Sequence, residues 1–240
     1  MASVKLFSSL IAVVPAAGIG KRMEANCPKQ YLKINSLTIL EHTVLNLLSH
    51  PDITQVILVI SAEDEYFNES SLVNHPDVVS VIGGKERVNS VLAGLKAIDE
   101  TKHQWALVHD AARPCIEHKD IDALIASCRQ TNYGGILASL ARDTMKSSDS
   151  KSQITATVER SNLWHALTPQ MFETKILINA IEQALVDEII ITDESSAIEY
   201  LGLPSLLVEG SSENIKITRP EDLALAMFYL GKNNKDNLCV

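Results

Sequence analysis

Short apolar runs rich in valine and isoleucine alternate with segments of helical periodicity along most of this chain. The runs that predict buried β-strands lie at 10–14, 56–60, 78–82, 105–108 and 135–140. Strands that alternate with helices at this spacing favour a mainly parallel sheet, because parallel neighbours need a crossover connection. The sequence therefore predicts an α/β fold, with helices on both faces of the sheet.

Helical periodicity fills most of the intervals between these runs. The ranges that we predict as helices are 39–48, 86–98, 121–128, 174–185, 193–201 and 220–230. Thr38 is placed to cap the first helix, and Pro220 suits the first turn of the last one. Two more short strands are expected at 206–208 and 215–217. Because no repeat or linker interrupts the pattern, we predict a single Rossmann-like domain over residues 1–240.

Glycines and polar residues gather directly after three of the predicted strands. The first strand leads into a glycine loop at 15–20, the third ends at Gly83 and Gly84, and the fourth ends at 109–114. In open parallel sheets, ligands bind beyond the carboxyl ends of the strands. We therefore expect the functional site at this edge of the sheet.

The glycine loop has the properties of a phosphate-binding turn. Gly18 and Gly20 allow positive φ angles and a close approach of the backbone, and Arg22 and Lys29 add positive charge. Met23 stands where the dinucleotide fingerprint has its third glycine, and no Gly-Lys-Ser/Thr ending of a P-loop is present. The loop therefore favours a polyphosphate ligand, and a turn that serves only packing is the alternative.

Several charged residues near this edge are candidates for chemistry. Asp110 follows a buried strand, where a carboxylate holds a divalent cation or caps the next turn. Arg113 suits a phosphate, with an ion pair to Asp110 as the alternative. Lys216 alternates with two isoleucines, which leaves open whether it faces the ligand or solvent. His109 and His165 have no nucleophile in a recognisable setting, so we interpret both as structural.

Two acidic residues precede one of the predicted helices. Asp193 and Glu194 follow Thr192, and they resemble a carboxylate pair. We interpret them as a capping turn, because acidic side chains stabilise the amino end of a helix.

Residues 142–161 differ from the rest of the chain. They are polar, with a serine-rich centre at 147–152 and alternating residues at 154–158. This pattern predicts a β-hairpin arm that protrudes from the domain. Since an isolated hairpin is only marginally stable in water, we expect the arm to pack on a second subunit. A mobile surface loop is the alternative.

Charge and cysteine usage narrow the possible partners and location. The formal net charge of −9 argues against nucleic acid or an anionic membrane as the main partner. No apolar run approaches the length of a membrane span. The four cysteines form no C-x-x-C pair, which indicates reduced thiols in the cytoplasm. Residues 5–18 imitate a secretion signal, but Ser8 and Ser9 interrupt the apolar run.

Motifs along most of the chain resemble those of one enzyme family. In chain order they are Pro15 to Met23, Pro28 to Tyr31, Val108 to Pro114, Arg142 to Lys146, Leu167 to Gln170, Ile191 to Glu194, and Asn214 to Asp222. The first is similar to the loop of many sugar-phosphate nucleotidyltransferases. Together they resemble the 2-C-methyl-D-erythritol 4-phosphate cytidylyltransferases of the non-mevalonate isoprenoid pathway.

This resemblance implies a reaction and a set of site residues. A homodimer with interlocking arms would use Mg²⁺ to transfer CMP from CTP to methylerythritol 4-phosphate, with release of pyrophosphate. The residues with implied catalytic roles are Arg22, Lys29, Lys216 and Asp110, of which Asp110 would also lie near the metal. Those implied to hold the nucleotide are Pro15, Ala16, Ala17, Gly18, Gly20, Gly84, Arg87, Ser90 and Ala111. Those implied to surround the acceptor are Arg113, Thr144, Arg160, Thr168 and Thr192, with Arg113 and Thr144 supplied by the opposite subunit.

One departure and three rival functions accompany the resemblance. Lys85 follows Gly83 and Gly84, at a position where the family commonly has an acidic residue. If the side chain at this position contacts the nucleotide, the difference affects the preference for cytosine. The rivals are a ribitol 5-phosphate cytidylyltransferase, a non-catalytic nucleotide-binding protein, and a glycosyltransferase. The retained cations disfavour the second, and the missing Asp-x-Asp motif disfavours the third.

Overall fold

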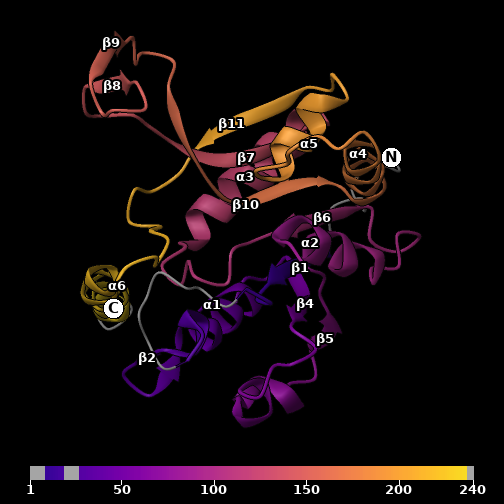
Figure 1. Ribbon diagram of the computed structural model, residues 1–240. Helices are drawn as coiled ribbons and strands as arrows, with labels where there is room; N and C mark the ends of the chain where they lie inside the picture. Colours follow the sequence, from indigo (N-terminus) through magenta and orange to yellow (C-terminus); the bar gives the residue numbers. More distant parts are fainter. Residues whose placement is uncertain (1–8, 19–26, 237–240) are drawn as a thin grey trace.

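A seven-stranded sheet forms the centre of the computed structural model, which describes residues 9–18 and 27–236 (Figure 1). In spatial order the strands are β11 (Ser205–Glu209), β7 (Gly134–Leu140), β10 (Trp164–Glu173), β6 (Trp105–Val108), β1 (Leu10–Pro15), β4 (Ile53–Ile60) and β5 (Val78–Ile82). All neighbours are parallel except β10, which runs antiparallel to both β6 and β7. The predicted mainly parallel α/β sheet is confirmed.

Helices cover both faces of the sheet, as the periodicity predicts. Helices α1 (Ile39–Leu48) and α3 (His118–Thr131) pack in the hydrophobic cluster on one face. The opposite face carries α2 (Arg87–Lys96), α4 (Thr174–Val186) and α5 (Glu194–Tyr200). None of the helices within the described ranges is long and apolar enough to span a bilayer.

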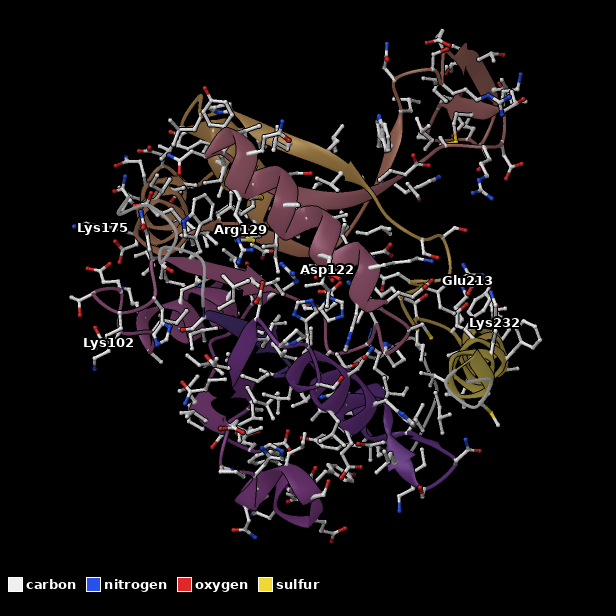
Figure 2. All side chains as sticks on the ribbon, turned by 180° about the vertical axis from the view of Figure 1, so that it is seen from behind. Lys102, Asp122, Arg129, Lys175, Glu213 and Lys232 are labelled. Carbon is white, nitrogen blue, oxygen red and sulfur yellow. The ribbon has the colours of Figure 1, made fainter. Side chains whose placement is uncertain are left out.

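The last helix, α6 (Pro220–Asp236), packs outside these two layers (Figure 1). Its Ala226 lies in a third apolar cluster with Ile34 and Cys115. On the outer side, Lys232 pairs with Glu213 at 2.9 Å (Figure 2). The helix thus supports the segment that precedes it, which carries Lys216.

Local sequence explains the central elements. Strand β1 is fully apolar because β4 and β6 flank it and helices cover both of its faces. Thr38 caps α1 as predicted, and Glu41 completes the capping box. Helix α2 approaches β1 closely at Gly94, where a Cβ atom would lie only 2.5 Å from Cγ1 of Val13.

The predicted hairpin arm is confirmed. Strands β8 (Met145–Ser148) and β9 (Ile154–Val158) form a separate two-stranded antiparallel sheet. Both views show it projecting from the body (Figures 1 and 2). The arm joins the ends of β7 and β10, which pair with each other through Leu140 and Trp164.

Two features differ from the sequence prediction. Strand β10 was not predicted, although it lies inside the sheet. The strand predicted at 215–217 is wrong, because the amide of Ile217 bonds to the carbonyl of Ala112 in a loop instead of to a strand partner. The described residues also form the smaller strands β2 (Lys33–Ile34) and β3 (Leu37–Thr38) and the 3₁₀ turns η2 (Lys29–Tyr31), η3 (Phe67–Glu69) and η4 (Ser71–Asn74).

Candidate active site

Two neighbouring cavities lie at the carboxyl ends of β1 and β6. The first, here the glycine-loop cavity, lies against the segment that follows β1 and the start of α2. The second, here the Thr168 cavity, lies between the middle of β10 and the segment that precedes α5. Arg87, Asp110 and Lys216 line both cavities and form the wall between them.

Most residues with an implied nucleotide role meet in the glycine-loop cavity. The predicted residues that line it are Pro15, Ala16, Ala17, Gly18, Lys29, Gly84, Arg87, Ser90, Asp110, Ala111 and Lys216. Lys85, the residue that departs from the family pattern, also lines it. Gly20 and Arg22 lie outside the described residues, so their predicted roles stay predictions.

Gln30 also lines this cavity, although no role was predicted for it from the sequence. Its side-chain amide is buried and donates hydrogen bonds to the carbonyl oxygens of Ala16 at 2.7 Å and Gly18 at 3.2 Å. The Nζ atom of Lys29 donates to the carbonyl of Ile217 at 3.0 Å. These bonds fix the start of the glycine loop and join its tail to the segment that carries Lys216.

Asp110 is the centre of the wall between the cavities. Its carboxylate lies 2.8 Å from Nζ of Lys216, 3.1 Å from Nη2 of Arg87 and 3.5 Å from Nε of Arg113. Burial raises the pKa of Asp110, but Arg87 and Lys216 outweigh burial and hold that pKa well below its usual range. Lys216 therefore faces the cavities, which answers the question that its sequence pattern left open.

A second buried carboxylate holds Arg87 from the other side. Glu194 accepts bonds from Nη1 of Arg87 at 2.7 Å and from Nη2 at 3.2 Å. Burial raises the pKa of Glu194, and the Arg87 guanidinium opposes that shift. The sequence predicts a capping turn at Asp193 and Glu194. This is confirmed for Asp193, which accepts from the amide of Ser196, but Glu194 has this additional role.

The Thr168 hydroxyl lies between Asp110 and His109. It accepts a hydrogen bond from the Asp110 amide at 3.0 Å and lies 3.0 Å from Nδ1 of His109. Its proton is therefore free to bond to Nδ1, which leaves Nε2–H of His109 to donate to the Arg113 carbonyl. Burial lowers the pKa of His109 to about 4, so the imidazole is neutral at pH 7 and has a structural role, as expected.

The predicted acceptor residues separate into two groups. Arg113, Thr168 and Thr192 line the Thr168 cavity of their own chain. The expectation that the opposite subunit supplies Arg113 is wrong, because its Nη1 donates to the Asn214 carbonyl of the same chain at 2.7 Å, and its ion pair with Asp110 is also present.

The remaining two acceptor candidates, Thr144 and Arg160, are exposed residues of the arm region. Arg160 donates to the backbone carbonyl of Arg142. Neither residue lines the two cavities as the described residues form them. A single chain therefore does not bring them to the site.

The site has few candidate metal ligands. No group of three His, Cys, Asp or Glu side chains suited to a metal ion occurs within the described ranges. Asp110 lines both cavities, and Mg²⁺ often binds through one or two carboxylates together with substrate phosphates and water. The donor set therefore fits a cation that arrives with a polyphosphate.

Comparisons with known proteins agree on one family. The family model described as 2-C-methyl-D-erythritol 4-phosphate cytidylyltransferase matches residues 10–232. A protein of that name from Colwellia psychrerythraea is 62% identical over 230 residues, which cover 92% of this chain and 95% of the relative. Another, from Vibrio vulnificus, is 55% identical over 227 residues, which cover 94% of this chain and 96% of the relative.

Solved structures agree with these relatives. The crystal structure of 2-C-methyl-D-erythritol 4-phosphate cytidylyltransferase from Francisella tularensis matches with a TM-score of 0.81 and 36% identity. The match covers 92% of this chain and 100% of that one. A structure of 4-diphosphocytidyl-2C-methyl-D-erythritol synthase matches with a TM-score of 0.79 and 37% identity, over 93% of this chain and 98% of that one.

Proposed function

The chain belongs to the 2-C-methyl-D-erythritol 4-phosphate cytidylyltransferase family, and we propose that it carries out the family's reaction at the wall between the two cavities. It is a nucleotidyltransferase of isoprenoid biosynthesis that transfers CMP from CTP to 2-C-methyl-D-erythritol 4-phosphate. The products are 4-(cytidine 5′-diphospho)-2-C-methyl-D-erythritol and pyrophosphate. The observation that carries the proposal is the cationic wall around Asp110, which faces both cavities.

Each cavity suits one substrate. The glycine-loop cavity would take CTP, with the triphosphate against the residues from Ala16 to Gly18 and Lys29. The Thr168 cavity would take methylerythritol phosphate, with its phosphate near Arg113. The acceptor phosphate and the α-phosphorus of CTP would then meet beside Lys216.

No protein nucleophile or general base is required. A phosphate monoester has a second pKa near 6, by analogy with phosphorylated side chains, so the acceptor is mostly dianionic at neutral pH. Its oxygen attacks the α-phosphorus of CTP while the bond to the β-phosphate oxygen breaks. Lys29 and Lys216 neutralise the repulsion between the two anions, align them and stabilise the departing pyrophosphate.

We propose Mg²⁺ as the cofactor, held by Asp110 together with oxygens of the nucleotide phosphates. When bound, the cation neutralises charge on the triphosphate and makes pyrophosphate a better leaving group. The protein's own part is to present Asp110 in its ionised form, because Arg87 and Lys216 keep its pKa low.

We also propose that the enzyme works as a homodimer joined through the arm. Thr144 and Arg160 are exposed on an arm that projects from the body (Figure 1). A hairpin of this kind is only marginally stable alone. The arm of one copy would bring Thr144 and Arg160 to the Thr168 cavity of the other copy.

The cell compartment and the remaining partners are proposals as well. Cys27, Cys115 and Cys128 are free thiols, as expected in a reducing compartment, which supports a cytoplasmic location. The net charge of −9 supports the absence of nucleic acid and of anionic membranes among the partners.

Pyrophosphate release tests the reaction and the acceptor. CTP and Mg²⁺ are supplied with either methylerythritol 4-phosphate or ribitol 5-phosphate, and we expect release with the first acceptor alone. Release only with ribitol 5-phosphate would refute methylerythritol 4-phosphate as the acceptor. No pyrophosphate release with either compound would favour a non-catalytic nucleotide-binding protein. Lys216→Ala should lose turnover, whereas the control Lys175→Ala removes only an exposed lysine of α4 (Figure 2).

A further inference from the structure

We propose that Glu194 is a positioning residue for cytidylyl transfer: it anchors Arg87, and through Arg87 it fixes Asp110 at the wall between the two cavities. Glu194 lines neither cavity as the described residues form them. Any effect of Glu194 on the reaction must therefore pass through a neighbour. This inference rests on the proposed function.

The geometry around Arg87 makes that neighbour clear. Nη1 and Nη2 donate to Glu194, while Nε and Nη2 donate to Oδ1 of Asp110 at 3.2 and 3.1 Å. A guanidinium has five N–H groups, so carboxylates occupy four of them. The main task of Arg87 is thus to hold Asp110, and at most one N–H is left for the nucleotide that we expected it to contact.

Helix α5 does not need Glu194 as a cap. Asp193 is the N-cap residue and already accepts the bond from the Ser196 amide. The Glu194 side chain instead reaches Arg87, which lies 107 positions earlier in the chain, and it is only 2% exposed. A buried carboxylate is costly unless a partner compensates for its lost hydration, so Glu194 and Arg87 depend on each other.

The ion pair between Arg87 and Glu194 links two helices, α2 and α5, whose starts lie beside the two cavities. Arg87 is the first residue of α2, close to Ser90, whose Oγ accepts from the Gly84 amide at 3.2 Å beside the glycine-loop cavity. Glu194 is the first residue of α5, two positions after Thr192 in the Thr168 cavity. The bidentate ion pair therefore fixes the two helix starts relative to each other, with Asp110 between them.

The test is a double-substitution cycle in the pyrophosphate-release assay. Glu194→Gln keeps the shape of the side chain and removes its charge, and we expect kcat/KM to fall about 10-fold or more. Arg87→Gln should also lower kcat/KM. In the Arg87→Gln background, Glu194→Gln should cause no further loss, because the guanidinium that Glu194 holds is already absent. Glu199→Gln, an exposed position on the same helix, should match the wild type.

Two further measurements separate positioning from folding. Circular dichroism confirms that each variant is folded, and Glu194→Asp, which retains the charge, should recover part of the activity if Glu194→Gln folds poorly. Unchanged kcat/KM in Glu194→Gln, or an equal loss with and without Arg87, would overturn the inference. A wild-type enzyme that releases no pyrophosphate would instead refute the proposed function.

Discussion

Replacing Thr168 by valine removes one hydroxyl and nearly preserves the shape of the side chain. That hydroxyl is buried and makes two hydrogen bonds, one from the Asp110 amide and one to Nδ1 of His109, each 3.0 Å long. The substitution leaves a buried amide and a buried imidazole nitrogen without partners. Each unsatisfied group costs about 1–3 kcal/mol, so the free energy of unfolding should fall by roughly 2–6 kcal/mol.

Denaturant unfolding followed by circular dichroism measures this loss. The variants are compared at one protein concentration, since association shifts the apparent stability. Thr168→Ser keeps the hydroxyl and should lose much less stability than Thr168→Val, while the slope with denaturant stays constant. A Thr168→Val protein within about 0.5 kcal/mol of the wild type would refute the assigned hydrogen bonds. Turnover should also fall, because the same residue lines the Thr168 cavity and bonds to the amide of Asp110.

Three further predictions follow from the structure. Lys29→Ala should reduce turnover at least about 100-fold in the pyrophosphate assay, because this is the size of the loss when one transition-state contact is removed. Near-normal turnover in this variant would show that Lys29 has no part in the mechanism. The pKa of His109 is lowered to about 4, so the unfolded chain binds more protons than the folded chain between about pH 7 and about pH 4.5. The free energy of unfolding should therefore decrease by about 2 kcal/mol over this range, and a flat profile of unfolding at several pH values would contradict this. Gly94→Ala should lower the free energy of unfolding by about 1–3 kcal/mol, because the added Cβ would lie 2.5 Å from Val13, whereas Gly231→Ala has nothing within 4 Å and should not destabilise.

Local patterns predicted much of this fold. The predicted limits of α1, β5 and β6 agree with the structure, since apolar periodicity and a capping threonine are properties of neighbouring residues. The glycine-loop cavity was also predictable, because carboxyl ends of parallel strands meet at one edge.

Residues whose partners are distant in sequence escaped prediction. Strand β10 contains Thr168, Pro169 and Gln170, which disfavour a buried strand until their partners are known. Gln170, for example, accepts a bond from the amide of Ser195, 25 positions away. Glu194 looked like part of a helix cap because Arg87, which explains its burial, lies on another helix. The alternation around Lys216 left the direction of its side chain open, and only the ion pair with Asp110 in the folded chain decides it, since no strand forms there.

The way the arm joins the sheet has a consequence for its evolution and redesign. The chain leaves β7 at Leu140 and returns to β10 at Trp164, and these two residues face each other across the ladder. An exchange of residues 141–163 therefore keeps the strand register, because the two ends of the exchanged piece are already held together. The arm can thus be exchanged between relatives as a cassette, while the sheet and the edge that carries the two cavities stay in place.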